Sequence, residues 1–256
     1  MCKVIFIAWE RHRRSENIIK YFGIKSFIFE SKLNRIFKHP YFVFKTIYVV
    51  LRQRPKVLII QNPSIILTIL IIFIKWIKIG KYFLIVDAHN EGILPFEKRM
   101  LIPLGVYKWI QRKTNITIVT NKKLAELVKK NGGQPFVLPD KIPENFIIKD
   151  VRLEGKFNIV CICTFAKDEP IDEIITAANN LDPGDKIYLT GNYKKAEPSL
   201  INDIPENLIF TGFLNENEYW GYLKNSDCIV DLTLMDDCLV CGAYEALAVG
   251  KPILLS

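Results

Sequence analysis

Residues 236–256 read DDCLVCGAYEALAVGKPILLS, and this closing segment decides the fold expected for the chain. It follows DCIVDLT (residues 227–233), a short apolar run typical of a buried strand. CGAYEALAV predicts a helix over residues 241–249, and KPILLS predicts a further strand over residues 251–256. A strand, a helix and a strand in this order predict a parallel β-α-β unit.

The same alternation runs through the whole chain. Strands are expected at 3–9, 26–30, 56–62, 81–90, 115–120, 135–140, 157–163, 186–192, 207–213, 227–233 and 251–256. Helices are expected at 15–24, with Ser15 as N-cap, and at 40–53, 64–80, 121–133, 171–180, 216–226 and 241–249. This order predicts an α/β protein with two Rossmann-like, doubly wound parallel sheets, and a ligand cleft at the carboxyl ends of the strands.

The length of 256 residues suits two domains, and the hydrophobic content of 50% supports a large core. The expected boundaries are a first domain over 1–141, a charged, Pro-bearing linker over 142–155, and a second domain over 156–256. No signal peptide is evident at the start. The six cysteines of an α/β chain are expected to be reduced thiols of a cytoplasmic protein.

Charge is divided unevenly between the two halves. Residues 1–141 hold 26 Lys and Arg against 8 Asp and Glu, whereas residues 142–256 hold 9 against 19. The strongly basic half predicts a polyanionic partner, unless it is simply a solvated basic face. No aromatic residues interleave with basic ones as stacking on nucleic acid requires, so nucleic acid is not expected.

One segment raises the question of a membrane. SIILTILIIFIKWIKIG (residues 64–80) is intensely apolar, but Lys75 interrupts it far short of the roughly 20 residues that a span needs. The segment predicts either a buried helix between two strands or a helix whose outer face lies on a membrane. Trp76, between Lys75 and Lys78, suits an anionic membrane surface, so peripheral attachment is expected.

Polar residues and glycines mark several strand ends. No dinucleotide-binding or P-loop glycine pattern occurs, but DAHN places Asp87, His89 and Asn90 after an apolar run, facing the expected cleft. TGN (residues 190–192) and TGF (residues 211–213) follow two further strands, where glycine lets a ligand approach the backbone.

The closing helix has the features of a phosphate site. Gly242 in its first turn is expected to offer unpaired N–H groups at the positive end of the helix dipole. Asp237 precedes the helix, and Glu245 lies within it among small apolar residues, where a carboxylate without a partner is costly. Two acids on either side of a phosphate cradle suit the hydroxyls of a nucleotide-diphosphate sugar.

These residues resemble the closing signature of GT-B glycosyltransferases, and of glycosyltransferase family 4 in particular. Asp237 stands where the family usually has Glu, and Glu245 matches the second acid. Further matches are WERHRRS, QNPS, VDAHN, VLPDKIPE, CTFAKDEP, TGNYKKA and GFLNENEYW. QNPS and VDAHN are also similar to mannosyltransferases that build lipid-linked oligosaccharides. The family's second domain continues beyond the GKPILLS strand, so this domain is expected to be incomplete at its C-terminus.

The resemblance implies a role for each matching residue. Asp237 and His89 are implied as catalytic residues, with Asp237 on the donor sugar and His89 facing the reacting carbon and the acceptor. The other residues implied in donor binding are Glu245 on the ribose, the backbone of Leu239, Val240, Cys241 and Gly242 on the diphosphate, Lys167 beside it, Gly212 and Phe213 near the base, and Thr164 and Gly191 at strand ends. No metal and no cofactor are implied, because the helix dipole and basic side chains neutralise the diphosphate.

The function expected is transfer of a hexose from a nucleotide-diphosphate sugar to a lipid-linked or surface glycan acceptor in polysaccharide biosynthesis. The protein is expected to be cytoplasmic and peripheral on the inner face of the cell membrane. Two alternatives stay open: a nucleotide-sugar epimerase of the same fold, and a non-catalytic basic protein that binds membrane or nucleic acid. The pair Cys238 and Cys241 could also form a redox pair or half a zinc site, but a zinc site needs a second pair of ligands.

Overall fold

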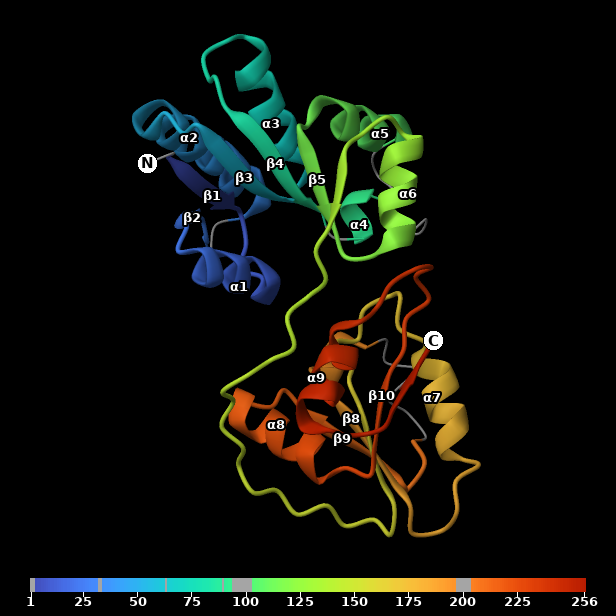
Figure 1. The fold of residues 1–256 in the computed structure, drawn as a ribbon. Coiled ribbons are helices and arrows are strands. Elements are labelled where there is room, and N and C mark those ends of the chain that lie inside the picture. Colours follow the sequence, from blue (N-terminus) through green and yellow to red (C-terminus); the bar gives the residue numbers. More distant parts are fainter. Residues whose placement is uncertain (1–2, 32–33, 63, 89, 94–102, 197–203) are drawn as a thin grey trace. The chain divides into compact units, whose positions relative to one another are not determined.

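The structure of the chain is a computed structural model that describes residues 3–31, 34–62, 64–88, 90–93, 103–196 and 204–256. It divides into two compact units, Met1–Asp140 (unit 1) and Lys141–Ser256 (unit 2) (Figure 1). Each unit is built on one parallel sheet, of six strands in unit 1 and five in unit 2. The expected α/β class, with two Rossmann-like sheets, is confirmed.

The sheet of unit 1 has the strand order β2-β1-β3-β4-β5-β6, and all neighbouring strands are parallel. The strands are β1 (Val4–Ala8), β2 (Lys25–Ile28), β3 (Val57–Asn62), β4 (Phe83–Ala88), β5 (Ile116–Val119) and β6 (Pro135–Val137). The central strands are continuous apolar runs because helices cover both faces. The chain winds in opposite directions from β1 to β2 and from β1 to β3, so the switch point lies between β1 and β3.

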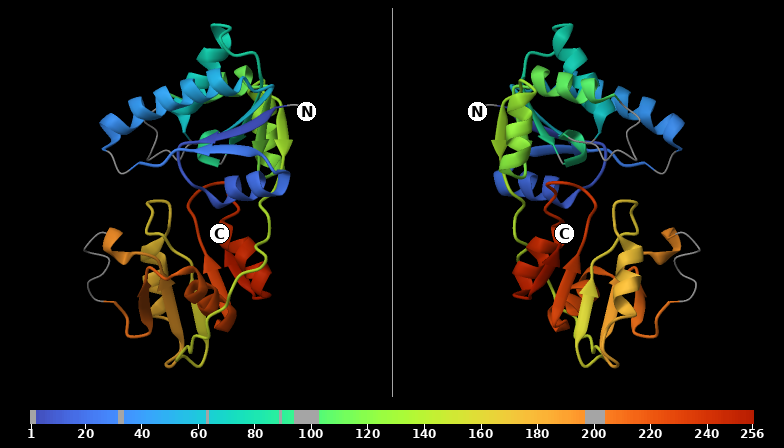
Figure 2. Two further views of the ribbon diagram at one scale, coloured as in Figure 1. Left: turned by 90° about the vertical axis from the view of Figure 1, so that its left-hand side faces the viewer. Right: turned by 90° about the vertical axis from the view of Figure 1, so that its right-hand side faces the viewer.

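The helices of unit 1 are distributed unequally over the two faces. They are α1 (Arg13–Phe22), α2 (Arg35–Gln53), α3 (Ile65–Trp76), α4 (Asn90–Ile93), α5 (Leu104–Lys113) and α6 (Lys122–Lys130). The larger core contains buried residues of α2 to α6 packed on one face of the sheet, whereas α1 packs on the other face through Ile18. Figure 2 shows α2 and α3 in one layer on the first face and α1 on the opposite side.

Two helices begin earlier than expected, and one further helix was not expected. α1 begins at Arg13 and its N-cap is His12, whose Nδ1 accepts from the N–H of Arg14, so Ser15 is a buried residue of the first turn and not the cap. α2 begins before Pro40, because a proline in the second turn removes only one helical hydrogen bond. α5 was not expected, although Tyr107 and Ile110 recur at helical spacing and are buried.

Unit 2 has the strand order β11-β10-β7-β8-β9, again all parallel. Its elements are β7 (Asn158–Cys161), α7 (Ile171–Ala178), β8 (Lys186–Thr190), the short helix η2 (Tyr193–Lys195), β9 (Leu208–Gly212), α8 (Glu216–Asn225), β10 (Cys228–Asp231), α9 (Cys241–Val249) and β11 (Ile253–Leu255). α7 packs on one face, and α8 and α9 pack on the other. The switch point of this sheet lies between β7 and β10.

Residues 142–155 contain no helix or strand, and they pack along unit 2. The Phe146 ring stacks on Trp220 of α8, with 4.0 Å between ring centroids. The N–H of Lys149 donates to the carbonyl of Asn217, and the N–H of Glu154 donates to the Tyr188 hydroxyl. This segment is therefore fixed to the surface of unit 2 by several contacts.

Candidate functional site

The carboxyl ends of β7 and β10 bring two loops together at the switch point of unit 2. The loop after β7 covers residues 162–170, and the loop after β10 covers residues 232–240. The N–H of Leu234 donates to the carbonyl of Asp168 over 2.6 Å, so the two loops are in direct contact. In doubly wound sheets, ligands bind in the crevice at this point.

The N-terminus of α9 lies at this switch point, and a carboxylate already accepts from one of its N–H groups. The N–H of Gly242 donates to Oδ2 of Asp231 over 2.8 Å, and a Cβ at Gly242 would lie only 2.3 Å from the same oxygen. The expectation of an unpaired N–H at Gly242 was therefore wrong, because this glycine serves close packing against β10. The N-cap Val240 provides no side-chain acceptor; Leu239 and Cys241 on either side are exposed.

Asp231 is the acid that the sequence interpretation missed. It is the last residue of β10 and is buried, and burial raises its pKa to about 7. The nearby carboxylates of Glu245 and Glu169 contribute to this raised pKa, while the Gly242 hydrogen bond acts in the opposite direction. Near neutral pH this carboxyl is therefore a mixture of its protonated and ionised forms, beside the position where a phosphate would meet the helix.

Glu245 is buried in α9 as expected from its apolar neighbours. It accepts a short hydrogen bond from the hydroxyl of Tyr219 in α8. An adjacent helix thus supplies a partner for this buried carboxylate. Tyr219 fixes the orientation of the Glu245 carboxylate, and the negative charge of that carboxylate raises the pKa of Asp231.

Glu169 organises the loop after β7. Its carboxylate accepts from the N–H and the hydroxyl of Thr164, from the N–H of Ala166 and from the thiol of Cys163. Both donors of Thr164 are thus used within the loop, and its expected role in donor binding stays a prediction. Lys167 lies exposed in the turn between these contacts.

The two strand-end glycines differ in their surroundings. Gly191 has φ +95°, and a Cβ there would lie 2.1 Å from the carbonyl oxygen of Cys163. The backbone that follows β7 therefore packs directly against this glycine. Gly212 has φ +72° with nothing within 4 Å of its Cβ position, so this site is open. Phe213 after it is 86% exposed. Asp237 is exposed in the loop before α9, with φ +55°.

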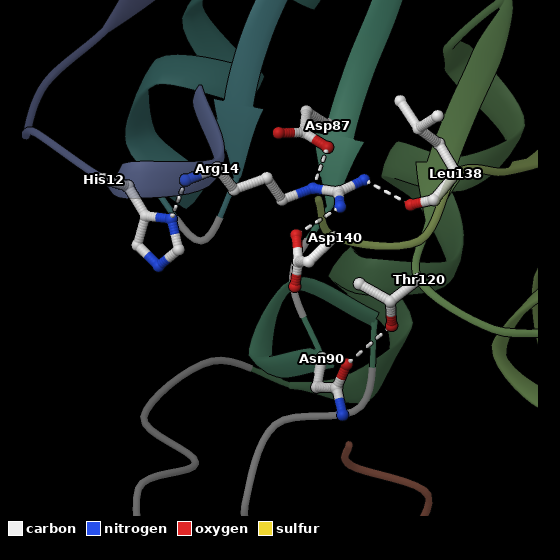
Figure 3. Close-up of polar contacts among 7 residues, drawn as sticks. All are labelled: His12, Arg14, Asp87, Asn90, Thr120, Leu138 and Asp140. Atoms are coloured by element: carbon white, nitrogen blue, oxygen red, sulfur yellow. Dashed lines mark hydrogen bonds and ion pairs between the residues drawn. The ribbon is translucent and has the colours of Figure 1, made fainter. Parts of the chain in front are cut away.

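A second polar cluster lies in unit 1, at the carboxyl ends of its strands (Figure 3). The buried guanidinium of Arg14 donates through Nε to Asp87 at 2.9 Å, through Nη1 to Asp140 at 2.5 Å and through Nη2 to the carbonyl of Leu138 at 2.8 Å. Arg14 therefore ties α1 to β4 and to the last residue of unit 1. Asp87 was expected to face a cleft, but it is fully buried because this arginine covers it.

The cluster retains unused hydrogen-bonding capacity. Burial raises the pKa of Asp87 against the opposing effect of Arg14. Asp87 Oδ2, the hydroxyl of Ser15 and both polar atoms of the Gln61 amide are buried without a hydrogen-bond partner among the described residues. Gln61 and Asp87 are register partners on β3 and β4, so their side chains share one face. Asn90, on α4, accepts from Thr120 at 3.4 Å. His89, the other expected catalytic residue, lies outside the described residues.

Other sites were searched within the described part of the chain. No group of three or more His, Cys, Asp or Glu there could hold a metal ion. Neither Cys238 nor Cys241 takes part in a disulfide bond in the described part of the chain. Of the helices described, none has the length and apolar character needed to cross a bilayer.

Comparisons with known proteins identify the fold. No protein-family model matches the chain, and no curated protein matches it either. Among solved structures, HepE of Anabaena in complex with UDP and glucose superposes with a TM-score of 0.69 at 12% identity, over 98% of this chain and 80% of that one. Sucrose-phosphate synthase of Thermosynechococcus elongatus gives a TM-score of 0.74 at 13% identity, over 99% and 81%.

A third structure belongs to a different class of enzyme. A protein of Listeria monocytogenes described as a putative UDP-N-acetylglucosamine 2-epimerase gives a TM-score of 0.63 at 11% identity, over 100% of this chain and 79% of that one. At these identities the likeness concerns the fold alone. The chain has the GT-B fold.

Proposed function

We propose that the protein is a glycosyltransferase that moves a hexose from a nucleotide-diphosphate sugar to a lipid-linked or surface glycan acceptor in polysaccharide biosynthesis. The observation that carries this proposal is the switch point of unit 2, where the N-terminus of α9 meets the buried acids Asp231 and Glu245. Structures with the same fold hold UDP or UDP-glucose, which supports a nucleotide sugar as donor. Membership of glycosyltransferase family 4, and the similarity to mannosyltransferases, are part of the proposal.

The proposed roles follow the arrangement of the site. The backbone of Leu239, Val240 and Cys241 binds the diphosphate at the positive end of α9, and Lys167 neutralises its charge. Glu245, oriented by Tyr219, accepts from the ribose hydroxyls. No metal or cofactor is proposed, because the helix dipole and the lysine supply the positive charge.

The remaining roles concern the sugar, the base and the acceptor. Asp237 accepts from hydroxyls of the donor sugar, and the open backbone at Gly212 with the exposed Phe213 ring receives the base. Thr164 and Gly191, in the loops that follow β7 and β8, are proposed to line the donor site. His89 is proposed to face the reacting carbon and the acceptor.

The alternative is a nucleotide-sugar epimerase, which the likeness to the Listeria protein favours. The two activities are separated by incubating the protein with a donor in the absence of any acceptor. An epimerase converts the donor to its epimer, whereas a transferase leaves the sugar configuration unchanged until an acceptor is supplied.

Calorimetric titration tests the donor site. A panel of UDP-, GDP- and ADP-sugars first finds the nucleotide that binds. Losing a hydrogen bond to a charged group costs about 1.5–3 kcal/mol, which corresponds to about 10–100-fold in affinity. Glu245→Gln is expected to weaken the nucleotide sugar and the bare nucleotide diphosphate alike.

Asp237→Asn is the matched acid-to-amide change on the sugar side. It is expected to weaken the nucleotide sugar and to leave the bare nucleotide nearly unchanged, because its proposed partner is the sugar. If the unaltered chain binds a donor and Glu245→Gln binds both ligands equally well, the assignment of Glu245 to the ribose is wrong.

A further inference from the structure

The outer faces of α2 and α3 carry exposed apolar stripes. The exposed residues of α2 are Phe37, Tyr41, Phe44, Tyr48 and Leu51, which recur every three or four positions and so lie on one side of the helix. Those of α3 are Ile66, Ile69, Phe73 and Trp76, with the same spacing. The opposite sides of both helices pack on the sheet, so the two stripes face away from the core.

The two stripes form one surface. α2 and α3 contact each other and lie in one layer on the same face of the sheet (Figure 2). Phe44 is 73% exposed and Trp76 is 75% exposed, although both are large aromatic residues. A contiguous apolar surface of this kind on a folded protein marks an interaction site. We refer to the nine residues of the two stripes as the α2–α3 face.

The charge around this face is of one sign. Residues 31–86 contain ten Lys and Arg and no Asp or Glu. Lys45 lies beside the α2 stripe, with its ammonium 4.5 Å from the ring centroid of Tyr41. Arg52 and Arg54 are exposed near the end of α2. A second copy of the chain would bring two such basic surfaces together, so repulsion disfavours a symmetric dimer through this face.

A basic hollow adjoins the face where α3 ends. It has a volume of about 510 Å³ and is lined by Lys56, Lys75, Lys78 and Lys81, together with Gly80, Tyr82 and Phe83. An adjoining hollow of about 590 Å³ shares Lys78 and Lys81 and adds Arg54. Lys75 is partly buried, which lowers its pKa, and its ammonium donates to Asn115 at 2.5 Å. The other lysines of the hollow are exposed, so their ammonium groups are accessible to an anion.

We propose that the α2–α3 face docks on an anionic bilayer, with the basic hollow receiving the phosphate of a lipid headgroup. Aromatic residues flanked by lysines are the combination that settles at the boundary between headgroups and acyl chains. The cytoplasmic leaflet carries the negative surface potential, so the proposal extends to peripheral attachment at the inner face of the cell membrane. It rests on surface chemistry and is independent of the proposed transferase activity.

Co-sedimentation of the full-length chain with vesicles tests the proposal. One set contains phosphatidylcholine alone, and the other contains about 30% phosphatidylglycerol. The chain is expected to bind the anionic vesicles at least about tenfold more strongly, and to lose about tenfold in binding between about 50 and 500 mM salt, because screening weakens the attraction. Equal binding to both vesicles, or binding to neither, overturns the proposal.

Two variants separate the hollow from the stripes. Lys78→Glu/Lys81→Glu reverses the charge of the hollow, and Phe44→Ser removes an exposed ring; each is expected to reduce anionic-vesicle binding about tenfold or more without lowering the melting temperature. The control is Lys194→Glu/Lys195→Glu, an equal charge change at exposed residues of unit 2, and it is expected to change binding less than about twofold. An equal loss of vesicle binding in the control variant would show that only net charge matters, and it overturns the assignment of the basic hollow.

Sedimentation velocity tests whether a second copy of the chain binds the α2–α3 face instead. The proposal predicts a monomer without vesicles at the concentrations used. A dimer that Phe44→Ser converts to a monomer would assign the α2–α3 face to a second copy of the chain and overturn the membrane proposal.

Discussion

Asp231→Asn tests the electrostatics of the unit 2 site. Asn keeps an oxygen that accepts from the N–H of Gly242, but it removes the charge that burial and the carboxylates of Glu245 and Glu169 disfavour. The pKa of Asp231 is raised from 3.8 to about 7. One pKa unit corresponds to about 1.4 kcal/mol, so full ionisation costs the folded state about 4 kcal/mol.

The sign of the effect follows from the raised pKa. The folded state binds the proton more tightly than the unfolded state, so the unaltered chain loses stability as the pH rises from about 4 to about 7, and the cost is complete above that range. Asp231→Asn has no carboxyl at this position to ionise, so it does not lose this stability. Between about pH 5 and pH 8.5, its stability relative to the unaltered chain is therefore expected to rise by about 3 kcal/mol.

Urea unfolding of both chains across this pH range measures the difference, and most other titrations cancel because the chains share them. The control is Asp182→Asn, the same substitution at an exposed position of unit 2. Carbon NMR of labelled aspartates should show one carboxyl that titrates near neutral pH and that is absent from Asp231→Asn. A difference in stability that does not change with pH, or that falls as the pH rises, would refute the reasoning.

Three further substitutions have expected outcomes. Arg14→Met leaves the buried Asp87 carboxyl without its cation and should destabilise unit 1 by about 3–5 kcal/mol in urea unfolding, with part of the loss restored by Asp87→Asn in the same chain; an unchanged midpoint would contradict this. Gly191→Ala places a Cβ against the carbonyl of Cys163, so the free energy of unfolding should fall by about 3 kcal/mol or more. Gly212→Ala, with open space at its Cβ position, should cost only about 1–2 kcal/mol by thermal unfolding, and equal losses at the two glycines would show that contact with Cys163 does not matter.

The order of strands and helices could be predicted because each strand is an apolar run with helices on both sides. The closing segment predicted α9 at its observed bounds, Cys241–Val249. The small residues of this helix allow it to pack closely on the sheet. α1 was placed too late because Ser15 is a common N-cap residue, whereas the cap is the less common His12. Periodicity alone does not show which side chain reaches back to the helix end.

The site was predicted less completely than the fold. The burial of Glu245 could be predicted because its neighbours in the helix are apolar, but its partner Tyr219 comes from another helix, 26 residues away in sequence. Asp231 escaped notice because it ends a strand and no sequence pattern shows that α9 folds back onto it. Arg14 and Asp87 are 73 residues apart, and only the winding of the sheet brings them together.

Hydrogen exchange with and without UDP-glucose tests the central claim, that unit 2 binds a nucleotide-diphosphate sugar at the β7–β10 switch point. Mass spectrometry of the full-length chain reports exchange segment by segment. Slower exchange is predicted in residues 162–170 and 231–245, because a ligand there engages backbone N–H groups at the start of α9 and orders both loops. Unchanged exchange in both segments at a saturating concentration of UDP-glucose, or protection confined to unit 1, would contradict the account.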